Sequence, residues 1–363
     1  MALVLAACGQ IDDDLSDCEV TPTEEYELDY ELKLVTNMTT ELKTQLNTIT
    51  DVEISDALKA NLSGVFRDYA HDVDLSFFDT QLDSLRLHHE SHIMDDTESS
   101  YTLNIPMREY LHLASANIIG NSVVSLRADE RCHKAHLFQV EADTINSHET
   151  GLFTARAFMK VLENVDQTFN VKLYMTNAAS SLVVDTTGVK CKNFRAYARG
   201  FATDFMMADS AYVYSENSPY VRAEELPVSG DFHQVGFCAV SFPSRNPNGW
   251  WIREKTDNTA DDSEVSVVRQ GKYAFTRAEG EIIPEGDYDE NDETLWEYVV
   301  LVTLEDGSIT KTTLEIKEPL LAGELKVIKG RMDTNGAVRP TDMNVGVSVT
   351  LNWDQGMEFE TEL

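Results

Sequence analysis

Alternation of apolar and polar residues recurs along this chain and predicts half-buried β-strands, because neighbouring side chains on a strand point to opposite faces. The alternation is strict at residues 26–34, 169–175 and 345–353. Further strand-like runs lie at residues 73–78, 85–93, 101–107, 110–116, 123–126, 153–162, 182–184, 194–205, 212–214, 235–242, 298–304, 309–316 and 325–328. The sequence therefore predicts a mainly β protein with many short strands.

One segment has a helical period instead. Apolar residues recur at helical spacing around residues 55 to 70, where Ser55 can act as the N-cap. The apolar face would contain Leu58, Leu62, Val65, Phe66 and Tyr69. We expect this helix to lie on a sheet.

Turn residues and a polar segment divide the chain. Asp306-Gly307 separates two strand-like runs and predicts a tight hairpin, and Asn335-Gly336 supplies a similar turn. A polar segment at residues 127–152 separates two series of strands. We expect two β-sandwich domains at residues 24–152 and 153–363 with one or two short helices, although one large all-β unit is the alternative for 363 residues.

The charge balance limits the partners of this chain. It carries 63 Asp and Glu residues against 29 Lys and Arg residues, a formal net charge of -34. Such a surface repels polyanions, so nucleic-acid binding is disfavoured.

The N-terminus contains a lipoprotein signal. An apolar run, Leu3-Val4-Leu5, is followed by Ala6 and Ala7 directly before Cys8. Small residues before a cysteine suit the narrow pocket of a signal peptidase, and acyl chains on Cys8 would hold the protein on a bilayer. The basic segment and longer apolar segment of a complete signal are missing, which we interpret as a late start codon or a trimmed sequence. Residues 1–23 are then a signal remnant and an acidic tether that includes Asp12-Asp13-Asp14.

The other cysteines leave two alternatives open. Cys18, Cys132, Cys191 and Cys238 allow three complete disulfide pairings in an oxidising compartment. Buried free thiols are equally compatible with the sequence.

Two clusters of ligand-type residues do not match a metal site well. His88, Glu90 and His92 would share one face of a strand, but they lack the HExxH spacing of a zinc protease. Residues 287–293 resemble the start of a calcium loop, yet Asp292 occupies the position that needs glycine. We expect a polar strand face and a solvated loop, and no metal.

Aromatic residues beside a turn suggest a second kind of ligand. Trp250 and Trp251 follow Asn246-Pro247-Asn248-Gly249 and would stack on a sugar if they were exposed, although such residues more often close the end of a sandwich. The sequence has no GxSxG elbow, no phosphate-binding glycine loop and no clear pair of nucleophile and base. We expect no catalytic residue, no cofactor and no enzymatic activity.

Several features together resemble the anchor-subunit lipoproteins of type V (fimbrillin-type) fimbriae of gut and oral anaerobes. The resemblance spans nearly the whole chain and is carried by Cys8 and residues 12–18, 26–32, 69–78, 110–114 and 345–353. It implies two transthyretin-like β-sandwich domains in tandem and assembly by strand addition, in which one subunit supplies a strand to its neighbour.

The resemblance also implies a function. A surface-exposed lipoprotein would be held on the outer membrane through Cys8 and would tether the shaft subunits of an adhesive fimbria. The strand at residues 345–353 is either the exchanged element or an ordinary core strand. A glycan-binding surface lipoprotein that uses Trp250 and Trp251 is the alternative function, and a secreted hydrolase is a third.

Overall fold

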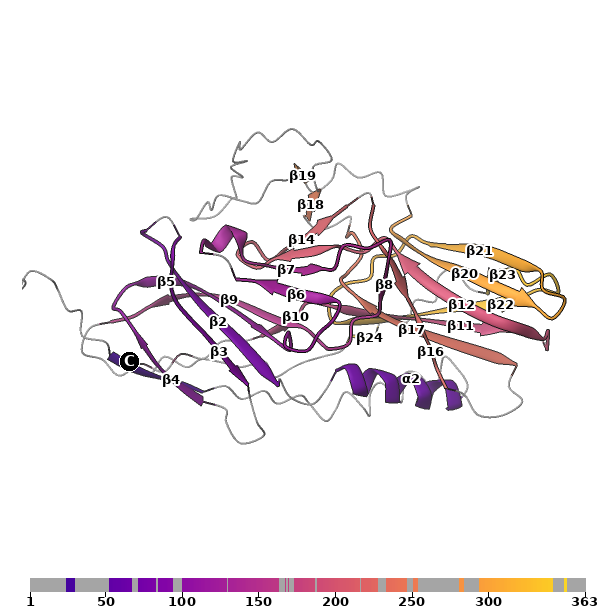
Figure 1. Cartoon of the computed structure of the whole chain (residues 1–363), viewed down its shortest axis with the longest axis horizontal. Helices are drawn as coiled ribbons and strands as arrows, with labels where there is room; N and C mark the ends of the chain where they lie inside the picture. Colours follow the sequence, from indigo (N-terminus) through magenta and orange to yellow (C-terminus); the bar gives the residue numbers. More distant parts are fainter. Residues whose placement is uncertain are drawn as a thin grey trace, which may run out of the picture.

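A computed structural model of the chain is mainly β (Figure 1). It describes residues 24–29, 52–66, 71–82, 84–93, 100–128, 130–162, 167, 169, 173–186, 188–215, 217–227, 233–246, 251–253, 281–283, 294–341 and 349–350. Four sheets of five or six strands and one two-stranded ribbon form in these residues. The predicted mainly β class is confirmed.

Two of the sheets form the first sandwich. Sheet I has the order β10-β9-β5-β2-β3, and sheet II has the order β19-β18-β14-β13-β7-β6. The strands of sheet I are β2 (Asp72–Asp79), β3 (Arg86–Ile93), β5 (Glu109–Ala116), β9 (Phe153–Lys160) and β10 (Tyr174–Met175). Those of sheet II are β6 (Val124–Arg127), β7 (His136–Gln139), β13 (Asp204–Met206), β14 (Ala211–Tyr214), β18 (Trp251–Arg253) and β19 (Glu281–Ile283).

The other two sheets form the second sandwich. Sheet III has the order β21-β20-β12-β15-β8, and sheet IV has the order β16-β17-β11-β22-β23 with β24 also beside β22. The strands of sheet III are β8 (Thr144–Asn146), β12 (Cys191–Arg199), β15 (Tyr220–Arg222), β20 (Trp296–Leu304) and β21 (Ile309–Ile316). Those of sheet IV are β11 (Ala178–Asp185), β16 (Glu224–Glu225), β17 (Gln234–Ser241), β22 (Glu324–Met332), β23 (Val338–Pro340) and β24 (Val349–Thr350).

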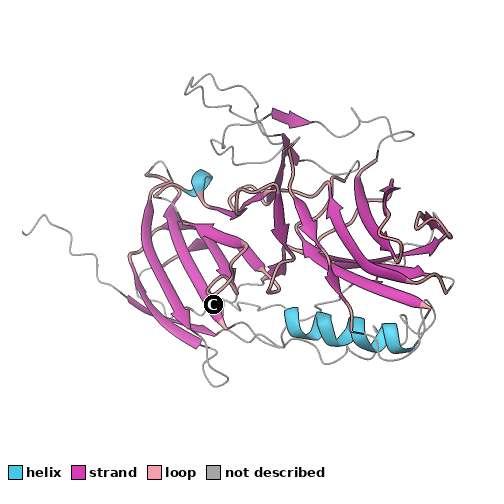
Figure 2. Ribbon diagram, turned by 45° about the vertical axis from the view of Figure 1, so that its right-hand side comes forward, coloured by secondary structure: helices cyan, strands magenta, loops and turns pink. Residues whose placement is uncertain are grey.

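The remaining elements are a ribbon and two helical segments. β1 (Glu24–Asp29) pairs with β4 (Ser100–Ile105), and a 3-10 turn, η2, spans Cys132–Lys134. The helix α2 (Val52–Val65) lies along the outer face of sheet IV, next to β17 (Figures 1 and 2).

One buried cluster includes residues from the inner faces of all four sheets. In the first sandwich, Leu113 of β5 and Leu137 of β7 belong to it. In the second sandwich, Phe194, Tyr298 and Phe237 belong to the same cluster. The alternation of each strand explains this core, because every second side chain points between the sheets.

α2 forms a third layer over a second buried cluster. Ile54, Leu58, Leu62 and Phe66 are at most 1% exposed and pack with Val240 and other residues of sheets I and IV. Burial of four such side chains contributes about 6–12 kcal/mol before entropy costs. A helix of this length is marginal alone in water, so tertiary packing stabilises it.

The predicted apolar face of this helix is confirmed, but its start is wrong. The helix begins at Val52, and Ser55 lies buried inside it instead of capping its N-terminus. Glu53 in the first turn interacts favourably with the partial positive charge of that helix end. Tyr69 lies outside the described residues.

Both predicted turns are present. β20 and β21 pair antiparallel around Asp306-Gly307, and Gly307 has a φ of 88°. Gly336, with a φ of 80°, lies between the antiparallel strands β22 and β23. These positive φ angles favour glycine, which explains why the Gly-containing pairs mark the turns.

Strand pairing crosses the expected domain division at residue 152. β9 follows this position directly and pairs along its length with β5. β8 precedes it and pairs with β15 in sheet III. Both expected ranges therefore contribute strands to both sandwiches, and a division into independent units stays a prediction.

Two glycine substitutions should have opposite effects on stability. Gly200 has a φ of 100°, and a Cβ there would lie 2.8 Å from the carbonyl oxygen of Leu295. Gly200→Ala should lower the free energy of unfolding by about 1–3 kcal/mol. Gly64 is exposed in α2, and a Cβ there would have no neighbouring atom within 4 Å, so Gly64→Ala should raise the free energy by about 0.5–1 kcal/mol. Urea denaturation tests both, and equal effects would contradict the packing described.

Two buried histidines should make the protein less stable in acid. His112 stacks on Phe77 at 4.3 Å between ring centroids, and burial lowers its pKa to about 4. Burial lowers the pKa of His148 to about 3. Between pH 6.5 and these values only the unfolded chain binds the protons, so stability should fall with pH by about 1.4 kcal/mol per unit for each histidine.

Substitution of one of these histidines provides the test. His148→Gln removes one titrating group, so its loss of unfolding free energy from pH 7 to pH 5 should be smaller than that of the wild type. Burial also raises the pKa of Asp72 and Asp74, which opposes the trend in both proteins equally. An unchanged slope in the variant would contradict the role given to His148.

Candidate functional site

One lateral edge of the second sandwich is closed by side chains. The hydroxyl of Thr310 on β21 donates to the carbonyl oxygen of Asn335 at 2.6 Å, and the amide of Val338 donates to the hydroxyl of Thr312 at 3.1 Å. These bonds join the edge of sheet III to β23 of sheet IV. They tie β21 to sheet IV through its side chains and use none of its outer backbone amides and carbonyls.

Farther across sheet III, the side of β12 that faces away from β20 is only partly paired. β12 has nine residues and pairs from Cys191 to Arg199 with β20, but its other neighbour, β15, pairs only with Tyr197 and Ala198. The amide of Ala223 adds one hydrogen bond to the carbonyl oxygen of Ala196 at 2.9 Å. Among the described residues, no strand pairs with this side of residues 191–195.

The antiparallel pattern shows which backbone groups this open edge presents. The amide and carbonyl of one residue point to the same side, and successive residues alternate. Because Ala196 bonds outward to Ala223, the amide and carbonyl of Phe194 also point away from β20. They face a groove.

The groove forms because the chain changes sheets within one residue. β15 ends at Arg222 in sheet III, and β16 begins at Glu224 in sheet IV. The space left beside β12 has a volume of about 590 Å³, and we call it the edge groove. Its lining consists of Asn146, Ser147, Glu149, residues 193–196, residues 222–225 and Phe237.

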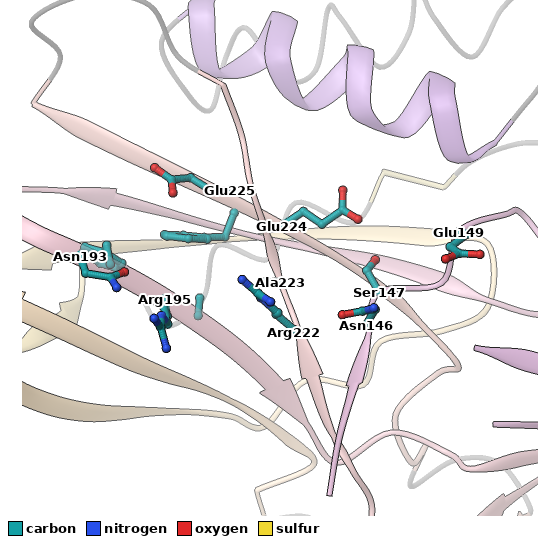
Figure 3. Close-up of a pocket in the computed structure, with 12 residues that line it drawn as sticks. Asn146, Ser147, Glu149, Asn193, Arg195, Arg222, Ala223, Glu224 and Glu225 are labelled. Carbon is teal, nitrogen blue, oxygen red and sulfur yellow. The ribbon is translucent and has the colours of Figure 1, made fainter. Parts of the chain in front are cut away.

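Figure 3 shows the two sides of the edge groove. Asn193 and Arg195 lie along β12, whereas Glu224 and Glu225 lie nearer to α2. The side toward sheet IV has satisfied backbone groups, since Val240 of β17 donates to the Ser147 hydroxyl and accepts from the His148 amide, each at 2.8 Å. The open backbone edge therefore belongs to β12.

Two aromatic rings lie under the groove. Phe194 of β12 and Phe237 of β17 stack with their centroids 5.2 Å apart. They are 7% and 1% exposed, so they form an apolar floor that is already packed. In a bound strand, the side chains on one face would contact this floor, and those on the other face would point away from it.

The rim of the groove is charged and fixed by neighbours. The side-chain amide of Asn61 on α2 donates to Glu224 Oε2 at 3.0 Å, and Ser122 donates to Glu149 Oε1 at 2.7 Å. Arg195 and Arg222 contribute cations to the same lining. The rim therefore offers carboxylates and guanidinium groups around an apolar centre.

The nearby thiols are held in the protonated form. Burial raises the pKa of Cys238, and the negative charge of Glu224 raises it further. Burial and then Glu225 raise the pKa of Cys191 in the same way. A thiolate nucleophile is disfavoured at both positions.

Three of the cysteines are free thiols in the structure. Cys132 and Cys238 are buried, and Cys191 is partly buried. No disulfide joins any two of them, whereas Cys18 lies outside the described residues.

Of the residues that the sequence proposed for lipid and glycan contacts, only Trp251 is described, and it does not line the edge groove. Cys8 and Trp250 lie outside the described residues. Trp251 is the first residue of β18 and pairs with Ile283 through the backbone. Their roles stay predictions.

The predicted polar face of β3 is present at the edge of sheet I. Glu90 Oε1 lies 2.7 Å from His88 Nε2, and Glu90 Oε2 lies 2.8 Å from His92 Nε2. Within the described part of the chain, no group of three such residues can hold a metal ion. Residues 287–293, which resemble part of a calcium loop, lie outside it.

Sequence reasoning missed the edge groove. Phe194 and Phe237 were expected as strand residues, but nothing marked the two-residue strand Glu224–Glu225 that pairs with β17. A pair of charged residues has no alternation that could reveal a strand. The only available signal was the end of an apolar run after Val221.

Comparison with known proteins gives structural likeness without sequence likeness. No protein-family model and no curated protein matches the sequence. No helix in the described residues has the length and apolar character needed to cross a membrane.

Solved structures with a similar arrangement include fimbrial proteins and adhesins of Porphyromonas and Bacteroides. The fimbrial anchor protein Mfa2 from Porphyromonas gingivalis is 11% identical, with a TM-score of 0.43 over 77% of this chain and 91% of that one. A candidate adhesin from Bacteroides ovatus is 9% identical, with a TM-score of 0.47 over 95% and 99% of the two chains. The tip fimbrial protein Mfa3 from P. gingivalis is 9% identical, with a TM-score of 0.35 over 88% and 99%.

Proposed function

We propose that this protein is a lipid-anchored structural subunit at the base of a bacterial surface fimbria, where it tethers the shaft to the outer membrane. A shaft subunit would supply an extended strand to the edge groove. The observation that carries this proposal is the unpaired side of β12 at residues 191–195, which opens into that groove.

An open strand edge has a clear physical use. Unpaired amide and carbonyl groups form a template for another strand, and natural proteins usually cover or shorten such edges. At the other edge of sheet III, Thr310 and Thr312 of β21 bond to Asn335 in the turn before β23 and to Val338 of β23. Residues 193–195 of the open stretch on β12 keep the regular antiparallel register with β20, and an irregularity in the register lies between Cys191 and Asn193. Strand addition would therefore continue sheet III beyond β12.

The groove also sets the chemistry of the incoming strand. Its side chains would alternate between the apolar floor of Phe194 and Phe237 and the solvent. Basic residues near one end would meet Glu224 and Glu225, and acidic residues would meet Arg195. Backbone pairing would supply most of the affinity, and these contacts would fix the register.

The lipid anchor is the second part of the proposal. Acylation of Cys8 would attach the chain to the outer membrane, and the acidic residues behind it would keep the first sandwich clear of the surface. This arrangement needs no catalytic residue and no cofactor.

Loss of the anchor should release the protein and its fibres. In the native cell, Cys8→Ser should shift the protein from the membrane fraction to the medium, and fibres should be shed or abnormally long, because nothing holds or terminates the base. Fractionation and electron microscopy measure both effects. Normal fibres on intact cells would contradict the anchoring role.

A photocrosslinker in the edge groove should capture the shaft strand. Benzoylphenylalanine at Asn193 or Arg195, both exposed on β12, should give an adduct within purified fibres that maps by mass spectrometry to one strand of a shaft subunit. The matched control places the same group at Lys311 or Thr313, which are exposed on β21 at the opposite edge.

The two positions separate strand addition from general contact. Adducts at β12 alone support the proposal. Adducts at β21 alone, or equal adducts at both edges, would exclude the edge groove as the specific receptor for the strand.

A further inference from the structure

A second cavity lies where the chain leaves the first sandwich for the second. It has a volume of about 700 Å³ and sits beside β7, β13 and the connection that follows β7. We call it the junction cleft. Its lining includes Arg127, His136, Phe138, Glu141, Asp143 and Asp204.

Strand register places four of these side chains on one face of sheet II. Arg127 pairs with His136 across β6 and β7, and Phe138 pairs with Asp204 across β7 and β13. Leu137, between the two β7 residues, is fully buried in the core. His136, Phe138 and their partners therefore point to the outer face.

The outer face carries one aromatic ring, that of Phe138. The ring of Phe138 is half-buried, and its centroid lies 5.4 Å from that of His136. An aromatic surface beside polar groups suits a ligand with one apolar face and a polar edge.

The polar groups beside Phe138 are arranged for hydroxyl groups. His136 Nδ1 donates to the carbonyl oxygen of Lys134 at 2.8 Å, which fixes the ring and directs Nε2 toward Asp204. His136 Nε2 and Asp204 Oδ1 are 3.9 Å apart, too far for a direct hydrogen bond. A ligand hydroxyl placed in this gap can donate to Asp204 Oδ1.

The charges of the cleft select against acidic ligands. Glu141 and Asp143 are exposed in the lining, and with Asp204 they outnumber the guanidinium of Arg127. The formal net charge of -34 adds a repulsive field for anions. Carboxylates and a guanidinium group remain good partners for neutral hydroxyls.

We propose that the junction cleft binds a neutral saccharide, with the apolar face of one sugar ring on Phe138 and its hydroxyls on Asp204, Glu141 and Arg127. The proposal does not depend on strand addition, since the cleft and the edge groove lie on different sheets. It also uses none of the tryptophans that the sequence suggested.

Calorimetric titration with defined oligosaccharides tests the proposal. The full chain with Cys8→Ser is titrated with cellohexaose, xylohexaose, mannohexaose and maltohexaose, and with hexagalacturonic acid as the anionic probe. At least one neutral probe should bind with a Kd below roughly 1 mM. Phe138→Ala should weaken that binding by about tenfold, and Phe138→Tyr should retain it.

A matched aromatic control and a second variant complete the design. Phe158→Ala removes an aromatic residue on sheet I that is 45% exposed, and it should leave binding unchanged. Asp204→Asn should weaken binding without removal of the ring, and circular dichroism melts confirm that each variant is folded.

Three results would overturn the assignment. They are no binding of any neutral probe at about 5 mM, binding that persists in both folded variants, and tighter binding of the anionic probe than of every neutral probe.

Discussion

Backbone hydrogen bonding at the strand edges is the constraint on which this structure depends. Each sheet of a sandwich has two edges, and every amide and carbonyl there must find a partner or face water. On the β21 side, the hydroxyls of Thr310 and Thr312 bond to the turn before β23 and to β23 itself, while the outer backbone groups of β21 pair with no strand among the described residues. On the β12 side, the chain moves from sheet III to sheet IV and leaves part of the edge open.

Packing on both sides holds the edge groove in place. The floor under it belongs to the main core, since Phe194 and Phe237 remain packed with the rest of the second sandwich. α2 supports the wall from the other face of sheet IV, and Asn61 holds Glu224 in place. The open side of β12 thus lies directly above side chains of the main core.

The net charge affects how copies of the chain meet one another. The net charge of -34 keeps copies apart in solution and favours short-range contacts that satisfy the backbone over attraction by charge. The two cavities present different chemical groups. The edge groove presents backbone groups around an apolar floor, and the junction cleft presents carboxylates around one aromatic ring.

The sequence by itself determined many of the strands, the apolar face of α2 and the turns at Gly307 and Gly336, because side-chain period and positive φ are local properties. It missed β7 and β8, which lie in the segment read as a polar boundary, and the short strands β15 and β16. It also named Cys8 as the lipid site, a prediction that depends on a few adjacent residues. Only the tertiary structure decided which strands pair, and it joined β9 to β5 and β8 to β15 across residue 152. Alternation indicates which side chains of a strand are buried, but it does not indicate which strands are neighbours in a sheet. The unpaired side of β12 and the pairing of Phe138 with Asp204 could therefore be seen only in the folded chain.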